Sequence, residues 1–205
     1  MKTKTKRRCP WLKAGDALYE KYHDTEWGVP VHNDKKMFEF LGLESAQAGL
    51  SWITVLRKRE NYRKAFAGFD PKRVSQFGKR EISVLLKNAG IIRNRAKIEA
   101  AINNATRFLE VQKEFGTFSK YIWQFVGNKQ KVNKLKKHSD YKPKSKESDA
   151  LAMDLKKRGF KFLGSTTIYA HMQATGMVND HVVDCFRYKA VGKRRPTKTA
   201  KQSQK

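Results

Sequence analysis

The sequence predicts an all-α fold, on three observations. Apolar residues in nearly every segment recur at intervals of three and four, as on one face of a helix. Glycine and proline separate these segments at points where helices end. With 205 residues, 39% of them hydrophobic, the chain can bury a core, which excludes wholesale disorder.

The predicted helices can be placed in order along the chain. The first covers residues 34–48, with Asp34 as its cap and Met37, Phe38 and Leu41 on its apolar face. A second starts at Trp52, and a turn at 69–71 precedes a third. Further apolar segments cover residues 82–86, 98–111, 115–125, 148–158 and 164–175.

The charge of the chain indicates a polyanionic partner. Lys and Arg number 45 against 19 Asp and Glu, a net charge of +26. Residues 1–8 hold five basic groups and residues 189–205 hold seven, without acidic residues, so both are expected to be disordered tails. The remaining body, residues 9–188, is expected to form one domain of charge +14 that binds nucleic acid. A membrane surface is the less favoured partner, because neither end shows a basic amphipathic helix.

Neither a membrane helix nor a secretory signal is evident in the sequence. No run approaches the roughly 18 apolar residues that a span needs, and residues 1–8 lack an apolar region. We therefore expect a soluble, cytoplasmic protein. Two cysteines 176 positions apart are too few for a disulfide framework.

A lysine-rich segment interrupts the helical pattern between residues 128 and 146. It holds eight lysines and one aspartate, so we expect a long, mobile surface connection. Two interpretations remain open, a solvated loop or a segment that faces DNA.

The link between the last two predicted helices carries a glycine at each end, Gly159 and Gly164. Glycines let a backbone approach a ligand closely, and the free N–H groups at the start of the next helix can bind a phosphate. This layout is typical of a helix-hairpin-helix element that binds the DNA backbone without reading sequence. A plain helical corner is the alternative.

Both cysteines stand near histidines. His181 and Cys185 are four residues apart, which places them on the same face of a helix. With Cys9 and His23 they make a Cys2His2 set, which suits a tetrahedral structural zinc ion. Two buried thiols and two ordinary histidines remain the alternative.

Glu44 lies on the apolar face of the first predicted helix. A buried carboxylate is unfavourable unless it is paired, so it marks either a structural hydrogen-bond hub or a functional site. Tyr19, Tyr22, Trp27 and Trp52 surround it in sequence. Aromatic faces and one acid suit a flat cation such as an alkylated base, whereas the alternative is a core cluster.

Five motifs occur in collinear order across residues 9–188. They read YHDTEWGVP (22–30), LESAQAGLSWITVLRKRENY (43–62), AGIIRNRAKI (89–98), KKRGFKF (156–162) and VNDHVV (178–183). Together they resemble the DNA-3-methyladenine glycosylase I family of the helix-hairpin-helix superfamily. The resemblance implies that fold, with a structural zinc site linking the N- and C-terminal segments.

The resemblance also implies roles for individual residues. The zinc ligands fall on Cys9, His23, His181 and Cys185. Glu44 would contact the methylated adenine with Tyr22 beside it, and these two are the implied catalytic residues. The implied base-binding residues are Trp52, Tyr19, Trp11 and Trp27, and the implied DNA-backbone contacts are Gly159, Phe160, Lys161, Gly164 and Thr166.

One position departs from the wider superfamily. Where many members carry an essential aspartate, this chain has Asn179, and the adjacent Asp180 is expected to point elsewhere. N3-methylation makes adenine a cation and a good leaving group, so the chemistry tolerates this loss. No lysine stands in an apolar setting as a Schiff-base nucleophile.

The activity that the resemblance implies is excision of a damaged base. The expected enzyme is a monomeric, monofunctional hydrolase that releases 3-methyladenine from alkylated double-stranded DNA and leaves an abasic site. A catalytically silent DNA-binding protein and a glycosylase for another damaged base are the alternatives.

Overall fold

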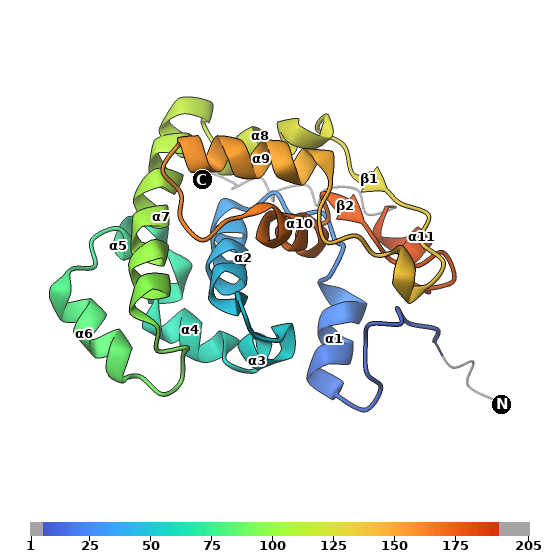
Figure 1. The fold of residues 1–205 in the computed structure, drawn as a ribbon, viewed down its shortest axis with the longest axis horizontal. Helices are drawn as coiled ribbons and strands as arrows, with labels where there is room; N and C mark the ends of the chain where they lie inside the picture. The colour runs from blue at the N-terminus through green and yellow to red at the C-terminus, as the bar shows by residue number, and fades with distance from the viewer. Residues whose placement is uncertain (1–5, 193–205) are drawn as a thin grey trace, which may run out of the picture.

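The computed structural model describes residues 6–192, which are mostly helical, as the sequence predicts. The long helix α7 runs along one side, and α2 lies in the middle of the molecule between α7 and α10 (Figure 1). The helices are α1 Ala17–Thr25, α2 Asp34–Gln47, α3 Trp52–Arg57, α4 Arg59–Ala65, α5 Pro71–Val74, α6 Lys79–Lys87, α7 Arg95–Phe115, α8 Phe118–Trp123, α9 Lys146–Lys157, α10 Ser165–Ala174 and α11 Tyr188–Val191.

Helix α2 forms the centre of the core. Met37, Phe40 and Leu43 along it are fully buried. Its cap differs from the prediction, because Asn33 and not Asp34 accepts the hydrogen bond from the backbone N–H of Lys36. Asp34 instead accepts from the first amides of α8, Phe118 N at 2.7 Å and Ser119 N at 2.9 Å. The carboxylate therefore caps a neighbouring helix, where the positive end of the helix dipole favours it.

A buried ion cluster fixes α1 against α2. The guanidinium of Arg59 on α4 donates to Glu39 on α2 and pairs with Glu26, which directly follows α1, at 2.9 Å. Such a charge is stable inside a protein only when it is paired in this way. The cluster therefore sets the position of the aromatic residues that α1 carries.

Helices α9 and α10 form the expected helical hairpin. Helix α9 begins at the cap Ser145 and ends at Arg158, and Gly159 follows with φ +83°, a value that favours glycine. Asn104 of α7 holds the link in place. Its side-chain amide donates to the carbonyl of Lys161 and accepts from the N–H of Lys161, both at 2.8 Å. This anchoring makes the link a fixed structural element.

The lysine-rich segment is more ordered than the sequence suggested. It contains β1, Lys131–Val132, which pairs in parallel with β2, Val178–Asn179. Beyond the strand, the N–H of Val183 donates to the carbonyl of Leu135 at 2.8 Å. The first half of the segment is therefore paired backbone and not a featureless loop, because these hydrogen bonds hold it against the C-terminal region.

The two ends of the described chain meet beside α1. Arg8 pairs with Asp24 at 2.8 Å, and Val191 of α11 is buried, so residues 6–8 and 189–192 make contacts where tails were expected. Residues 1–5 and 193–205, the rest of the expected tails, lie outside the described residues. None of the helices between residues 6 and 192 is long and apolar enough to cross a bilayer.

Candidate active site and metal centre

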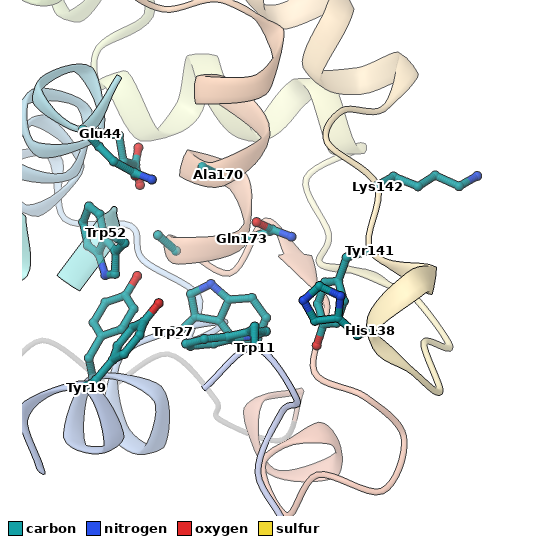
Figure 2. Close-up of a pocket in the computed structure, with 13 residues that line it drawn as sticks. Trp11, Tyr19, Trp27, Glu44, Trp52, His138, Tyr141, Lys142, Ala170 and Gln173 are labelled. Atoms are coloured by element: carbon teal, nitrogen blue, oxygen red, sulfur yellow. The ribbon is translucent and has the colours of Figure 1, made fainter. Parts of the chain in front are cut away.

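A cavity of about 300 Å³ opens between α1, α2, α3 and α10. Figure 2 shows its side chains around one opening, with Lys142 directed away from it. All six residues that the sequence assigned to base binding and catalysis line this cavity. The complete lining is Trp11, Tyr19, Tyr22, Trp27, Glu44, Gln47, Trp52, His138, Tyr141, Lys142, Ala170, Gln173 and Ala174.

Glu44 forms the acidic point of the cavity. Its side chain is 2% exposed, and its Oε2 accepts a hydrogen bond from His171 Nδ1 at 2.9 Å. Its other oxygen, Oε1, has no hydrogen-bond partner within the described residues. Burial raises the pKa of the Glu44 carboxyl, whereas the charge and hydrogen bond of His171 act in the opposite direction. One half of the carboxylate is thus available to a ligand.

Aromatic rings supply the walls of the cavity. Tyr22 of α1 and Trp52 at the start of α3 lie 5.4 Å apart between ring centroids, and Trp11 meets Trp27 edge to face at 4.9 Å. Burial, followed by the negative charge of Glu44, raises the pKa of the Tyr22 phenol well above its ordinary value. The phenol therefore stays protonated at neutral pH.

Two indole nitrogens in these walls also lack protein partners. Trp11 Nε1 and Trp52 Nε1 are buried and make no hydrogen bond within residues 6–192. Unpaired buried donors are rare in folded proteins, and a cluster of them beside an unpaired acceptor indicates a place for a ligand.

Seven of the lining residues were not singled out from the sequence, and four of them carry a ring or an amide. His138 and Tyr141 come from the lysine-rich segment, whose composition suggested only solvated loop, and Gln47 and Gln173 lie at or near the ends of α2 and α10. Only the tertiary pairing of β1 with β2 brings the segment to the cavity. The aromatic residue within the lysine run was the one signal that could have marked it.

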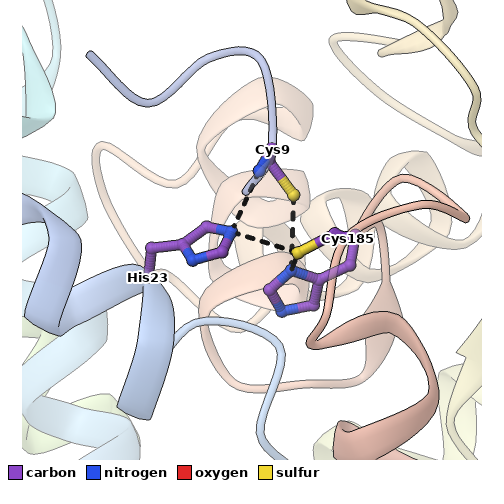
Figure 3. Close-up of side chains that lie close together, drawn as sticks. Cys9, His23 and Cys185 are labelled. Atoms are coloured by element: carbon purple, nitrogen blue, oxygen red, sulfur yellow. Dashed lines mark hydrogen bonds between the residues drawn. The ribbon is translucent and has the colours of Figure 1, made fainter. Parts of the chain in front are cut away.

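The four predicted metal ligands form a second, separate cluster (Figure 3). All four residues are buried, and their ligand atoms lie within 4.8 Å of one another. His181 and Cys185 do not lie on a helix as expected, because residues 181–185 form an irregular turn. The turn still brings Cys185 Sγ within 3.5 Å of His181 Nδ1.

The distances and outer partners of this cluster fit a tetrahedral zinc ion. Cys9 Sγ lies 3.3 Å from His181 Nδ1, and Cys185 Sγ lies 3.6 Å from His23 Nε2. Metal–ligand bonds of about 2.3 Å to sulfur and 2.0–2.1 Å to nitrogen give S···N edges of roughly 3.6 Å.

The outward ring nitrogens have partners outside the cluster, so the inward nitrogens, His23 Nε2 and His181 Nδ1, face the two thiols. Asp24 Oδ1 bonds His23 Nδ1 at 2.8 Å, and the carbonyl of Trp27 bonds His181 Nε2 at 3.0 Å. Gly28, with φ +77°, packs against His181 so closely that an added Cβ would lie 3.0 Å from the ring. The packing against His181 therefore leaves no room for a larger residue at position 28.

Where many helix-hairpin-helix enzymes carry an aspartate, this chain has Asn179, and its side chain does not point into the cavity. Asn179 donates to the carbonyl of Tyr188 at 2.9 Å. Asp180 is buried and accepts from Tyr169, Gln173 and Asn133 at 2.6–2.8 Å, as part of the support beneath α10. Neither residue lines the cavity. The expectation that Asp180 points elsewhere is confirmed.

The predicted DNA-binding residues gather at the hairpin. Gly164 is the N-cap of α10, and no atom lies within 4 Å of the place where a side chain would begin. Phe160 is buried and anchors the link, whereas Lys161 is exposed. Lys161, Gly164 and Thr166 therefore lie at the open start of α10, and Gly159 and Phe160 shape the link before it.

A helical hairpin beside an aromatic, acidic pocket defines the class of helix-hairpin-helix enzymes that take a base into a cavity. The chain belongs to the methyladenine glycosylase family, whose profile matches residues 11–188. It is 49% identical over 181 residues to "DNA-3-methyladenine glycosylase 1" of Escherichia coli (strain K12), covering 88% of this chain and 96% of the relative. A second relative, "DNA-3-methyladenine glycosylase" of Haemophilus influenzae, is 48% identical over 178 residues and is covered to 96%.

Solved structures agree with this assignment. A crystal structure of 3-methyladenine DNA glycosylase I superposes with a TM-score of 0.85 at 47% identity, covering 88% of this chain and 98% of that one. The Staphylococcus aureus enzyme, studied for its recognition of 3-methyladenine, gives 0.83 at 38% identity, covering 85% and 93%. The prediction of the family and of its fold is confirmed.

Proposed function

We propose that the protein is a monofunctional DNA glycosylase that hydrolyses the N-glycosidic bond of 3-methyladenine in alkylated double-stranded DNA. The observation that carries this proposal is the unpaired Glu44 Oε1 inside an aromatic cavity. The relatives at 48–49% identity carry the same activity in their names. A silent DNA-binding protein has no need to keep a buried carboxylate without a partner.

The pocket selects a cationic base by charge and shape. N3-methylation gives adenine a positive charge, and a buried carboxylate attracts a cation far more strongly than it attracts neutral adenine. Glu44 Oε1 accepts from the polar edge of the base, Trp52 stacks on its face, and Tyr22 lies beside it. Tyr19, Trp11 and Trp27 complete the enclosure. The base reaches the pocket by flipping out of the duplex, which costs a few kcal/mol and less for a damaged pair.

Bond cleavage then needs little acid catalysis. The C1′–N9 bond breaks with its electron pair moving to the purine, which neutralises the base's positive charge. A water oxygen attaches to C1′ and its proton leaves to solvent, so an abasic site remains. Lys142, the one lysine lining the cavity, is exposed and points away (Figure 2), which supports a hydrolase without lyase chemistry.

The open start of α10 holds the DNA backbone. Gly164 leaves room for a phosphate beside the free N–H groups of the helix, whose dipole favours an anion there. Lys161 and Thr166 add a charge and a hydroxyl, and Phe160 and Gly159 keep the link in shape. These contacts position the duplex without reading its sequence.

The lysine-rich segment extends this DNA contact to the rim of the pocket. All eight of its lysines are exposed, and within the described chain only Lys131 and Lys144 form ion pairs. His138 and Tyr141 of the same segment line the cavity, so the free lysines lie beside the place where a flipped nucleotide enters. Of the two interpretations left open by the sequence, the DNA-facing one is therefore favoured.

One structural zinc ion would be held by four side chains, those of Cys9, His23, His181 and Cys185. With four protein ligands the ion has no open position, so it supplies no catalytic chemistry and only fastens the two ends of the chain. A monomeric state and a cytoplasmic location, both expected from the sequence, stay predictions.

The proposed activity is tested by incubating the purified protein with methylated duplex DNA and identifying released bases by chromatography. We expect 3-methyladenine, and no covalent DNA adduct after borohydride treatment. DNA that is bound without any base release would support the silent alternative. A trapped adduct would contradict the monofunctional assignment.

A further inference from the structure

The hydrogen bond between Glu44 and His171 joins the pocket to the interior of α10. His171 is fully buried and does not line the cavity, since α10 contributes Ala170, Gln173 and Ala174 to the wall. Its Nδ1 lies 2.9 Å from Glu44 Oε2, across the contact between α10 and α2. Any effect of His171 on a bound base must therefore pass through Glu44.

The direction of this hydrogen bond follows from its chemistry. An ionised carboxylate only accepts, so His171 Nδ1 carries the proton and donates. The bond occupies Oε2 and leaves Oε1 without a partner. Because Oε2 is fixed, the carboxylate cannot rotate freely, and Oε1 keeps one orientation. Binding of a base then needs less ordering of this side chain.

The same contact favours the ionised form of Glu44. Burial raises the pKa of Glu44, and the only influences that lower it come from His171. The other titratable groups around the pair are Tyr22 and Tyr19 on α1, with His138, Tyr141 and Lys142 across the cavity. The facing residue of α3 is Trp52, which does not titrate. Within the described residues, His171 is the only basic side chain that lies within ion-pair distance of Glu44.

We infer that His171 is the positioning residue of Glu44, which holds Oε1 toward the base and keeps the carboxylate ionised, so that the pocket prefers cationic over neutral adenine. This inference rests on the proposed function and adds a residue to it. Sequence reasoning missed His171, because a lone histidine among apolar residues of a helix is ordinarily a core residue.

Two substitutions at this position separate positioning from packing. His171→Phe keeps a buried aromatic ring and removes the donor, whereas His171→Asn keeps an N–H donor near the place of Nδ1 and removes the ring. A hydrogen bond to a charged group is worth about 1.5–3 kcal/mol, so we expect His171→Phe to lower kcat/KM about 10- to 100-fold. His171→Asn should retain more activity than His171→Phe, although it should unfold at a lower temperature.

The pH profile supplies a readout that packing alone would not move. Without the donor, the pKa of Glu44 rises further, so as the pH falls His171→Phe should lose excision of 3-methyladenine from duplex DNA, where the base stays cationic, at a higher pH than the parent. His32→Phe is the control for removal of a histidine elsewhere, because His32 is an exposed histidine that stacks on Trp123 outside the cavity. The control should keep the parent's profile.

A double-mutant cycle tests the route through Glu44 even if His171→Asn fails to fold. In a Glu44→Gln background, His171→Phe should cause less than about a twofold further loss of kcat/KM. An equal loss in both backgrounds, a His171→Phe enzyme as active as the parent, or a folded His171→Asn less active than His171→Phe would each overturn the inference. Failure of the parent itself to release 3-methyladenine would instead refute the proposed function.

Discussion

At the scale of single residues, the burial of the Glu44 carboxylate makes the pocket selective for a cationic base and lowers the stability of the ligand-free protein. Its carboxylate is buried, and one oxygen has no protein partner. Desolvation of that charge disfavours the folded, ligand-free protein, and a cationic base relieves it. A pocket lined only by aromatic rings would be more stable and would not distinguish 3-methyladenine from adenine by charge.

The stability of the protein should reflect this arrangement. A carboxyl whose pKa is raised by folding binds protons more readily in the folded state, so its contribution to stability falls as the pH rises above the unfolded value. Glu44→Gln should therefore raise the melting temperature at pH 7, and the gain should shrink toward pH 4. Calorimetry of parent and variant across this range checks the sign. A variant that is less stable than the parent at pH 7 would contradict the account.

Stacking is the second contribution that a single residue makes. Trp52 lies 5.4 Å from Tyr22 and packs, partly buried, against the hydrophobic core. Stacking of a base on an aromatic ring is worth about 1–3 kcal/mol, so Trp52→Leu should weaken binding of free 3-methyladenine about 5- to 100-fold. Titration calorimetry measures this affinity directly. Equal affinity would show that Trp52 serves only the core.

At the scale of elements, the hairpin between α9 and α10 leaves its backbone open to a ligand at Gly164. Gly164 has an ordinary φ of −70° and open space where a Cβ would stand, so the fold itself does not require glycine there. In the proposed function, the requirement comes from the DNA backbone that approaches the start of α10. Gly159, in contrast, has a positive φ that the link itself needs.

Gly164→Ala should therefore separate DNA binding from stability. We expect a melting temperature within about 2 °C of the parent and roughly 10-fold weaker binding to undamaged duplex, since one phosphate contact is lost. Gly78→Ala is the matched control, because Gly78 is the N-cap of α6, away from the hairpin. Unchanged DNA affinity of Gly164→Ala in a fluorescence titration would remove the hairpin from the interface.

The elements also show what a sequence can and cannot predict. Most helices follow from local apolar spacing, and residues 165–174 form the expected helix, whereas α1, Ala17–Thr25, was not predicted. His171 could not be assigned, because its partner Glu44 lies 127 positions away and only the packing of α10 on α2 joins them. Tyr141 was missed for a similar reason, since a parallel strand pair places its segment. Asp34 lies at the predicted cap but serves another helix.

At the scale of the whole molecule, the Cys2His2 cluster joins the beginning and the end of the described chain. Trp11 and Trp27 of the base pocket pack on its histidines, with ring centroids 5.4 Å from His23 and 4.7 Å from His181 respectively. Loss of the cluster should therefore disturb the pocket as well as the fold.

Cys185→Ser tests whether the Cys2His2 cluster holds a zinc ion that joins the two ends of the described chain. Elemental analysis should find close to one zinc per parent chain and less than half in the variant, whose melting temperature should fall by roughly 10 °C, equivalent to about 3–5 kcal/mol. A parent purified without chelator that holds less than half a zinc per chain would count against the metal.

The charge of +26 is also a property of the whole molecule, and its distribution predicts a salt dependence. Lys134, Lys136 and Lys137 are exposed and make no ion pair within residues 6–192. Replacing all three by Gln should reduce the slope of log affinity against log salt by about 2–3, with binding of the free base unchanged. Lys72, Lys79 and Lys87, on and near α5 and α6 at the opposite side of the molecule (Figure 1), are the matched control set. Equal slopes for the two triple variants would show that the lysine-rich segment does not contact the DNA.

The central claim is that a buried carboxylate selects a methylated, cationic base, and excision by Glu44→Gln tests it most directly. Gln keeps the size and the hydrogen-bonding oxygen of Glu44 but removes its charge. Parent and variant are incubated in single-turnover experiments with duplex DNA containing 3-methyladenine, and the released base is quantified by chromatography. We predict rapid release by the parent and a rate at least about 10-fold lower for the variant, since charge-assisted hydrogen bonds are worth about 1.5–3 kcal/mol. Release at the parental rate by a folded Glu44→Gln protein would contradict the account.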